Sequence, residues 1–280
     1  MATEISRRRF IESAAAIGIG LPTILPSRGF GAPSANERLS FACIGMGGQM
    51  RGYLMPELGK IDQQIVAICD VDKRQRDSAL QAKGMSGARA YHDYRELLDK
   101  EKDVDAVIIA TPDHWHVPIC QAALESGKHV YCEKPLTHTW HEAKAIMAAA
   151  KKAGVVTQLG NQGHSTDTIR RTCEWVWAGA IGKVHTVHAG CGEFKEIYSQ
   201  IRNLDKLNQK YDIPSELDYN MWVGPAEFHP YTPFWVHWNW RGWMPYGTGT
   251  IGDWFCHVID PSFWALDLDA PTSIQAEVIG

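Results

Sequence analysis

The sequence lacks the concentrated positive charge that a nucleic-acid partner requires. Its formal net charge is −4, and no block of Lys and Arg occurs outside the first ten residues. Because binding to phosphates depends on a basic face, these features argue against a nucleic-acid ligand. With 280 residues, of which 45% are hydrophobic, the chain is ordinarily globular and long enough for two cores.

The chain also has no Cys-x-x-Cys pair. Three cysteines, Cys43, Cys69 and Cys132, lie in or beside apolar strand-like runs, where a thiol usually behaves as a small buried hydrophobic group. The full set of cysteines is Cys43, Cys69, Cys120, Cys132, Cys173, Cys191 and Cys256. An odd count at such scattered positions argues against both a disulfide framework and a zinc site. We therefore predict structural cysteines and no metal site.

The N-terminus combines a basic cluster, a short apolar stretch and a run of small residues. The cluster reads Ser-Arg-Arg-Arg-Phe at residues 6–10, the apolar stretch covers residues 13–25, and the small residues follow at 31–35. The stretch is shorter than the about 20 apolar residues that a spanning helix needs. The pattern therefore predicts a secretory leader over residues 1–35, with no stable membrane insertion after its removal. A basic tail before an amphipathic helix is the alternative, but the stretch has no polar face.

The order of residues 6–10 resembles the twin-arginine export signal of bacteria. This resemblance implies the twin-arginine export machinery as a partner and a periplasmic or otherwise exported location. It also implies that the protein crosses the membrane already folded, often with a cofactor inserted in the cytoplasm. Such a route suits unpaired cysteines, and we expect the mature chain to begin near residues 32–36.

From residue 39 onward, apolar runs alternate with amphipathic stretches. The apolar runs, interpreted as strands, are Leu39–Ile44, Gln64–Cys69, Val104–Ala110, Lys128–Tyr131 and Val155–Leu159. The amphipathic stretches, interpreted as helices, cover about residues 47–58, 73–83, 93–100, 114–125 and 138–153. Continuous apolar strands separated by helices are typical of a parallel sheet covered on both faces. We therefore predict the α/β class, with a doubly wound Rossmann domain over residues 36–160.

A glycine-rich turn follows the first predicted strand and leads into the first predicted helix. Gly45 permits a tight turn, and Gly47 allows a pyrophosphate to approach the backbone at the helix N-terminus. Met50 occupies the third position of the fingerprint, which usually holds Gly or Ala. The turn predicts a dinucleotide site contacted by Gly45, Met46, Gly47 and Gly48. A doubly wound domain that binds no nucleotide is the alternative.

An acidic residue, Asp70, ends the second predicted strand, where it is placed to bond to the ribose diol of the cofactor. Its carboxylate repels a 2′-phosphate, so the sequence favours NAD over NADP. Lys73 and Arg74 follow closely and could soften that preference. NADP therefore stays as the alternative cofactor.

Polar residues also follow the other predicted strands, at the sheet edge where ligands bind in open α/β folds. The third strand runs into Thr-Pro-Asp-His-Trp-His at residues 111–116. His114 and His116 are metal ligands by type, but no third ligand is nearby and zinc usually takes four. We therefore expect this loop to border the cofactor. The predicted cofactor-binding residues at these strand ends are Thr111, Pro112, His116, Glu133, Lys134, Asn161 and Gln162, of which Asn161 and Gln162 could contact the substrate instead.

The Glu-Lys-Pro motif at residues 133–135, the glycine turn, Asp70 and Thr-Pro-Asp-His-x-His together resemble the Gfo/Idh/MocA oxidoreductases. That family includes glucose–fructose oxidoreductase and inositol dehydrogenase. The resemblance covers residues 39 to about 162 and extends more thinly to residues 253–260. It implies a second α+β domain with an open, mostly antiparallel sheet over the nicotinamide end, which we place at residues 161–280. Because family members commonly have more residues there, we expect this domain to be incomplete.

The predicted second domain contains a segment rich in aromatic residues, from Trp222 to Trp264. This segment either stacks on a sugar ring or packs in a core and an interface, and the sequence favours neither. Arg241 and Tyr246, which lie within it, are candidates for hydrogen bonds to substrate hydroxyl groups. The regular elements predicted in this domain are a helix at Thr166–Trp177 and strands at Val184–Ala189 and Ser273–Ile279.

Asp253 and His257 are four residues apart, so on a helix they project from one face. An imidazole near its own pKa suits removal of a hydroxyl proton, and a nearby carboxylate can orient it. Taken alone, such a pair is more commonly an ordinary helix-surface pair. Matched to the family motif, His257 is implied to be the acid/base, with Asp253 as its partner or a substrate anchor. Lys134 is implied to bind the reacting oxygen and to stabilise the developing alkoxide.

Three functions are compatible with these features. The first is an exported oxidoreductase that moves hydride between a sugar, polyol or glycoside hydroxyl carbon and a tightly bound NAD, with a homo-oligomer expected as its assembly. The second is an NAD-dependent glycosidase or epimerase, which oxidises its substrate transiently and leaves no net redox change. The third is a non-catalytic sugar-binding protein that keeps the nucleotide as a structural element. The joint presence of Lys134 and His257 favours the first two.

Overall fold

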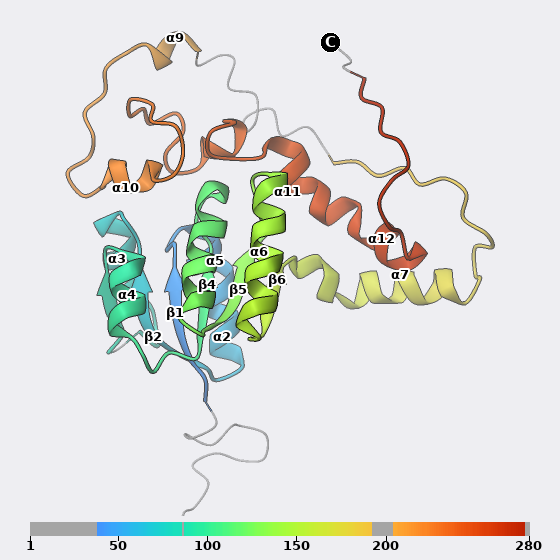
Figure 1. Ribbon diagram of the computed structural model, residues 1–280, viewed down its shortest axis with the longest axis horizontal. Coiled ribbons are helices and arrows are strands. Elements are labelled where there is room, and N and C mark those ends of the chain that lie inside the picture. Colours follow the sequence, from blue (N-terminus) through green and yellow to red (C-terminus); the bar gives the residue numbers. More distant parts are fainter. Residues whose placement is uncertain (1–37, 86, 192–203, 278–280) are drawn as a thin grey trace, which may run out of the picture. The chain divides into compact units, whose positions relative to one another are not determined.

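The predicted strands come together in one six-stranded parallel sheet (Figure 1). The structure is a computed structural model that describes residues 38–85, 87–191 and 204–277, so the predicted leader at residues 1–35 lies outside the described residues. The strands are β1 (Ser40–Ile44), β2 (Gln64–Cys69), β3 (Arg89–Tyr91), β4 (Ala106–Ile109), β5 (His129–Glu133) and β6 (Thr157–Gly160). Their order is β3-β2-β1-β4-β5-β6, which confirms the predicted doubly wound sheet.

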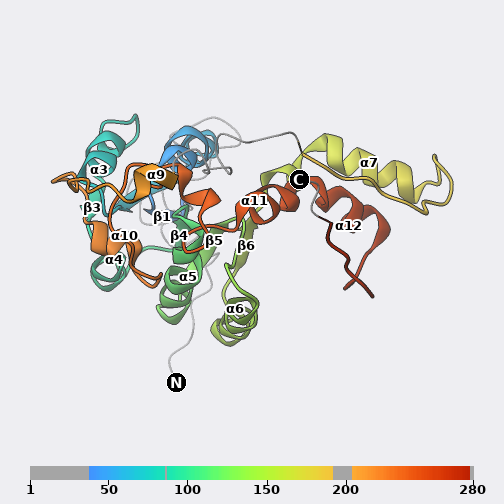
Figure 2. The ribbon, with the colours of Figure 1, turned by 90° about the horizontal axis from the view of Figure 1, so that it is seen from above.

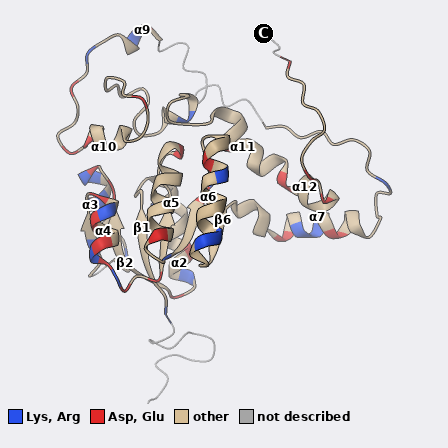
Figure 3. Cartoon of the chain, viewed as in Figure 1, with Lys and Arg blue, Asp and Glu red and all other residues tan. Residues whose placement is uncertain are grey.

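Helices cover both faces of this sheet, because successive strand side chains point to opposite faces. On one face, Ile44 and Ile109 belong to a buried cluster that also contains side chains of α4, α5 and α6. On the other, Cys43 and Ile108 pack with side chains of η1, α2 and α3. The helices are η1 (Met50–Leu54), α2 (Met55–Lys60), α3 (Lys73–Leu80), α4 (Tyr94–Lys100), α5 (His116–Glu125) and α6 (Trp140–Ala153). Charges of both signs are mixed along α3, α4 and α6 (Figure 3).

Local capping fixes where these helices begin. The carboxylate of Asp72 accepts a hydrogen bond from the backbone of Arg74 and starts α3. Thr139 and Glu142 form a reciprocal capping box at the start of α6, and Gly154, with φ of 65°, ends that helix. Such contacts satisfy backbone groups that a helix end leaves without partners.

The short strand β3 is the one strand of the described sheet that the sequence did not predict. Of its three residues, Arg89 and Ala90 are exposed and Tyr91 is buried. A run of three residues on the sheet edge is too short to give either a continuous apolar stretch or a clear alternation. Its pairing with β2 extends the sheet beyond the predicted edge.

The described residues after β6 form helices and irregular segments. The predicted helix at 166–177 is confirmed as α7, which packs beside α12 (Figure 2), and Trp177 Nε1 donates to the carbonyl oxygen of Ala265 at 2.9 Å. The predicted strand at 184–189 is wrong, since this stretch is almost entirely exposed and pairs with no described strand. Of the strand predicted at 273–279, residues 273–277 are irregular, and residues 278–279 lie outside the described residues. The elements of this part are η3 (Gln162–Ser165), α7 (Asp167–Trp177), α9 (Leu204–Leu207), α10 (Tyr219–Val223), η5 (Asn239–Gly242), α11 (Gly249–Val258) and α12 (Asp260–Leu266).

The C-terminal part contacts the strand ends largely through its backbone. Nε2 of His114 lies 3.0 Å from the carbonyl oxygen of Trp222, and Nε1 of Trp115 donates to the same oxygen at 2.9 Å. Nε2 of His138 lies 3.0 Å from the carbonyl oxygen of Gly247. Side chains of the Rossmann part thus contact backbone carbonyl oxygens of residues 222–247. None of the described helices combines the length and apolar character needed to cross a membrane.

Candidate active site

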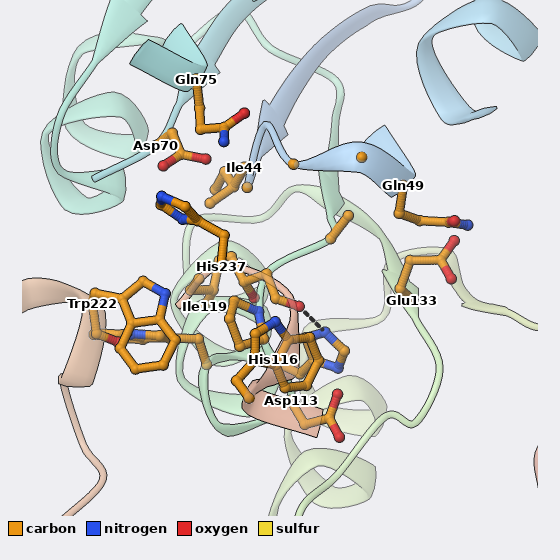
Figure 4. A pocket seen from close by; sticks show the side chains of 18 of the residues that line it. Ile44, Gln49, Asp70, Gln75, Asp113, His116, Ile119, Glu133, Trp222 and His237 are labelled. Carbon is orange, nitrogen blue, oxygen red and sulfur yellow. Dashed lines mark hydrogen bonds between the residues drawn. The ribbon is translucent and has the colours of Figure 1, made fainter. Parts of the chain in front are cut away.

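A cavity of about 340 Å³ lies at the carboxyl ends of the central strands, where the C-terminal part meets the sheet (Figure 4). Most of the predicted site residues line it. They are Gly45, Gly47, Gly48, Asp70, Thr111, Pro112, His116, Glu133, Lys134, Gln162, Asp253 and His257. The structure thus gathers into one pocket residues that are spread over more than two hundred positions of the chain.

The glycine turn has the shape that a pyrophosphate requires. Gly45 has φ of +84°, and a Cβ there would lie 2.7 Å from the backbone of Ala110 and Thr111, so only glycine fits. A Cβ on Gly47 or Gly48 would meet nothing within 4 Å, which leaves the backbone open toward the pocket. The buried hydroxyl Oγ1 of Thr111 has no hydrogen-bond partner among the described residues. An open turn beside an unpartnered hydroxyl fits a phosphate group at this position.

Met46, the fourth residue predicted in the turn, has a different place. Its side chain is fully buried and does not line the cavity. Its backbone N–H donates to the carboxylate Oδ2 of Asp70 at 2.7 Å. Met46 therefore anchors the turn through its buried side chain, and its backbone N–H fixes the orientation of Asp70.

Asp70 lies at the end of β2, with its carboxylate held by two backbone groups. Besides the bond from Met46, its Oδ1 accepts the N–H of Asp72 at 2.8 Å. Burial raises the pKa of Asp70 to about 6. Each nearby cation already has a partner: Lys73 pairs with Asp77 at 2.5 Å, Arg74 pairs with Asp72 at 2.7 Å, and Arg76 donates to the carbonyl oxygen of Asp70. A 2′-phosphate would thus meet a carboxylate whose neighbouring cations already have partners, and the site favours NAD.

The two histidines of the 111–116 loop contact backbone carbonyls. Nδ1 of His116 lies 2.7 Å from the carbonyl oxygen of Pro135, and its Nε2 lies 2.9 Å from that of Thr111. His114 is also buried between two carbonyls, and burial lowers its pKa to about 4, so its ring is neutral. Among the described residues no group of three or more potential metal ligands gathers. His116 therefore borders the pocket, and His114 joins the loop to the C-terminal part.

Lys134, Asp253 and Arg241 form a line of ion pairs in the pocket wall. The ammonium of Lys134 contacts the carboxylate Oδ1 of Asp253 and donates to its carbonyl oxygen at 3.1 Å. The other carboxylate oxygen lies 3.2 Å from Nε of Arg241, whose guanidinium stacks on the rings of Trp238 and Trp240 at 4.2 and 4.3 Å. The three charged side chains are 14%, 13% and 18% exposed. Low exposure strengthens these electrostatic contacts and fixes the position of the lysine.

His257 follows Asp253 by one turn of α11, as the spacing predicted, and lines the same cavity. It is half-buried. Burial and the ammonium of Lys134 lower the pKa of His257, an effect that the carboxylates of Asp253 and Asp260 oppose. A neutral imidazole beside a lysine is a group that can accept a proton.

Glu133 is the last residue of β5, and Asn161 and Gln162 follow β6. Gln162 donates to the carboxylate of Glu133, and burial raises the pKa of that carboxyl group. Asn161 does not line the cavity: its amide donates to the carbonyl oxygen of Cys256 at 3.1 Å and so ties the end of β6 to α11. Glu133 and Gln162 are thus available to a ligand, whereas Asn161 positions the helix that carries His257.

In the aromatic segment, some side chains pack in a buried cluster, some line the pocket, and some do both. Trp222, Trp235 and Tyr246 belong to one buried cluster; Trp222 also lines the cavity, whereas Trp235 and Tyr246 do not. Trp238, which is 53% exposed, and Arg241 line the pocket. The lining residues that the sequence did not single out include Gln49, Gln75, His92, Tyr94, His237 and Trp254. Their local patterns are those of ordinary surface residues, so nothing in the sequence distinguished them.

Two models of one oxidoreductase family match the chain. The model described as "Oxidoreductase family, NAD-binding Rossmann fold" matches residues 39–161. The model described as "Oxidoreductase family, C-terminal alpha/beta domain" matches residues 170–279. Together they extend over the sheet, the glycine turn and the segment that carries Asp253 and His257.

Individual relatives match more partially. Levoglucosan dehydrogenase of Pseudarthrobacter phenanthrenivorans is 38% identical over 33% of this chain and 23% of its own length. Inositol 2-dehydrogenase of Salmonella typhimurium is 31% identical over 45% of this chain and 37% of its own length. A glycosyl hydrolase family 109 protein of Parabacteroides distasonis is 27% identical over 80% of this chain and 51% of its own length. The chain thus spans about half or less of the length of these relatives.

Solved structures agree on the fold. The aldose–aldose oxidoreductase of Caulobacter crescentus superposes with a TM-score of 0.50 at 26% identity, over 58% of this chain and 51% of that chain. This likeness accords with the sheet order and with the two matched family models. The chain therefore belongs to the Gfo/Idh/MocA family of oxidoreductases and carries that family's NAD-binding Rossmann domain.

Proposed function

We propose that this protein oxidises a hydroxyl-bearing carbon of a sugar, polyol or glycoside, with NAD as the hydride acceptor. The observation that carries the proposal is the placement of Lys134, Asp253 and His257 in the cavity that the glycine turn and Asp70 also line. Relatives named as levoglucosan and inositol dehydrogenases support the choice of substrate class. Bound NAD supplies the electron-pair acceptor, and the chain supplies the remaining groups.

The charged and titratable side chains of the pocket have different roles in this reaction. Lys134 donates a hydrogen bond to the reacting oxygen and stabilises the negative charge that develops on it. His257, whose pKa is lowered, is neutral near pH 7 and accepts the hydroxyl proton on a ring nitrogen. Asp253 holds the ammonium of Lys134 in place by an ion pair, while Arg241 holds Asp253. Oxidation thus leaves the proton on the protein as the carbonyl forms.

The test is a substrate panel. Purified protein loaded with NAD is mixed with sugars, polyols and glycosides, and the absorbance band of the reduced nicotinamide is followed. A stable rise with one class of compound supports net oxidation. If none of the panel changes the band or is chemically altered, the proposal is wrong for these substrates.

A second candidate is a redox-neutral glycosidase or epimerase. The match with the glycosyl hydrolase family 109 protein favours it, because that match extends over 80% of the chain. Transient oxidation beside a glycosidic bond acidifies the neighbouring C–H and permits elimination. Reaction in deuterated water distinguishes the two candidates: deuterium enters the adjacent carbon only in the second scheme.

We also propose that the chain is exported by the twin-arginine route and assembles as a homo-oligomer. The Ser-Arg-Arg-Arg-Phe sequence at residues 6–10 supports export. Cell fractionation of the protein with Arg7→Lys and Arg8→Lys should find it retained in the cytoplasm, and unchanged export would refute the route. Light scattering after gel filtration gives the oligomeric state, and a monomeric mass would refute the assembly.

A further inference from the structure

The chain between residues 216 and 240 contacts the ends of β2 and β3, next to Asp70. The N–H of Lys73 donates to the carbonyl oxygen of Glu216 at 2.9 Å, and the N–H of Asp218 donates to that of Val71 at 3.2 Å. These bonds flank an antiparallel bridge between Asp72 and Leu217. The C-terminal part is therefore fixed to this strand end by backbone pairing.

A side-chain contact at the same place involves a deeply buried carboxylate. The side chain of Asp72 is 1% exposed and pairs with Arg74 at 2.7 Å. Nε2 of His237 lies 3.0 Å from the Asp72 carboxylate. The two partners belong to segments 165 positions apart, so this pair joins the Rossmann part to the aromatic segment.

A second contact reinforces the first. Nε2 of His92, which follows β3, lies 2.9 Å from the carboxylate of Asp218. Residues 216–240 also have a core of their own, since Leu217, Trp222 and Trp235 pack in one buried cluster against Val71. The segment is thus anchored at several points.

The anchored segment lines one end of the cofactor cavity. His237 lines it together with Asp70, Gln75, His92 and Tyr94, and Figure 4 shows His237 and Asp70 at the same end, away from Glu133. In a Rossmann domain the acidic residue after the second strand marks the adenosine ribose. We propose that residues 216–240 form a clasp over the adenosine end of the dinucleotide, which exchanges only after His237 has parted from Asp72.

The clasp has a kinetic signature. Opening removes a hydrogen-bonded partner from a buried carboxylate, which disfavours the open state. Because entry and exit pass through that open state, the clasp slows both of them. A residue that merely touches the bound cofactor would slow exit alone. The proposal rests on the NAD site that the proposed function also uses, and it does not depend on the sugar chemistry.

The test measures NADH exchange by fluorescence, without any sugar. Release is followed after adding excess NAD, and binding is followed after rapid mixing. His237→Ala should speed both rates by about tenfold, the factor for loss of one charge-assisted hydrogen bond, with a smaller change in Kd. His237→Gln, which keeps a donor toward Asp72, should restore much of the slow exchange. His164→Ala is the matched control, because that ring also lies 3.0 Å from a carboxylate, that of Asp260, but belongs neither to residues 216–240 nor to the cavity lining.

The outcomes are distinct. Exchange at the parental rates in a folded His237→Ala protein overturns the clasp alone. Faster release with an unchanged binding rate also overturns it, because His237 is then a simple contact. If the parent protein binds no NADH, both the clasp and the proposed oxidoreductase function are refuted. If His164→Ala accelerates exchange as much as His237→Ala, the effect is one of general loosening, and the clasp is refuted.

Discussion

Gly45 offers the sharpest test of the cofactor turn. An alanine there would hold φ near +84°, in the left-handed region that costs an L-residue about 1–2 kcal/mol. Its Cβ would also lie 2.7 Å from backbone atoms of Ala110 and Thr111, which directly follow β4. Overpacking of this kind costs about 1–3 kcal/mol. Gly45→Ala should therefore lower the free energy of unfolding by about 2–5 kcal/mol.

Gly48→Ala is the matched control. Its Cβ would meet nothing within 4 Å, and the residue begins the helix with an ordinary φ. The free energy of unfolding should change by less than about 1 kcal/mol, while the added methyl group faces the pocket and weakens NADH binding. Comparing the two variants thus separates the effect of the turn on stability from its effect on NADH binding.

The assay is urea or thermal unfolding followed by circular dichroism, together with NADH titration. A loss of about 3 kcal/mol corresponds to a Tm roughly 6–12 °C lower in a domain of this size. Parental stability of Gly45→Ala would refute the described conformation of the turn. Equal destabilisation by Gly48→Ala would show that the strain is not local to Gly45.

Three further predictions concern the charged groups of the pocket. Lys134→Ala and His257→Ala should each lower turnover at least about 100-fold while NADH still binds, and retained turnover in both would refute their assignment. Burial raises the pKa of Asp70 to about 6, so the folded protein holds this proton to higher pH than the unfolded chain does. The free energy of unfolding should therefore fall by up to about 3 kcal/mol between about pH 4 and 6, a slope that urea titrations of Asp70→Asn should no longer show. Arg241→Ala removes the second partner of Asp253 and should lower kcat about tenfold with little change in NADH affinity, whereas a KM effect alone would make Arg241 a substrate contact.

The sequence was sufficient for the parts of the fold that local pattern determines. Continuous apolar runs predicted five of the six strands. The glycine turn with Asp70 predicted that the pocket lies at the carboxyl ends of the strands. The spacing of Asp253 and His257 predicted their common place on a helix. In each case the signal is read from short stretches of chain, although Asp70 lies 25 positions after Gly45.

Contacts between distant segments were not predictable in this way. The pair Asp72–His237 depends on how the C-terminal part settles on the sheet, and no local pattern encodes it. The failure at 184–189 has the same origin, because an alternating stretch becomes a strand only where another strand offers hydrogen bonds. Asn161 follows a strand as expected, yet its amide bonds to the backbone of α11.

The joint between the two parts has a consequence for how such a protein can change. His114, Trp115 and His138 hold carbonyl oxygens of Trp222 and Gly247, and a carbonyl is present whatever side chain the residue bears. Mutations between residues 222 and 247 can therefore alter the wall that faces the substrate without removing these anchoring acceptors. These backbone contacts do not depend on the side chains at 222–247, unlike the Asp72–His237 pair, so new substrate preferences could arise there, His237 apart, at little cost to the assembly of the active site.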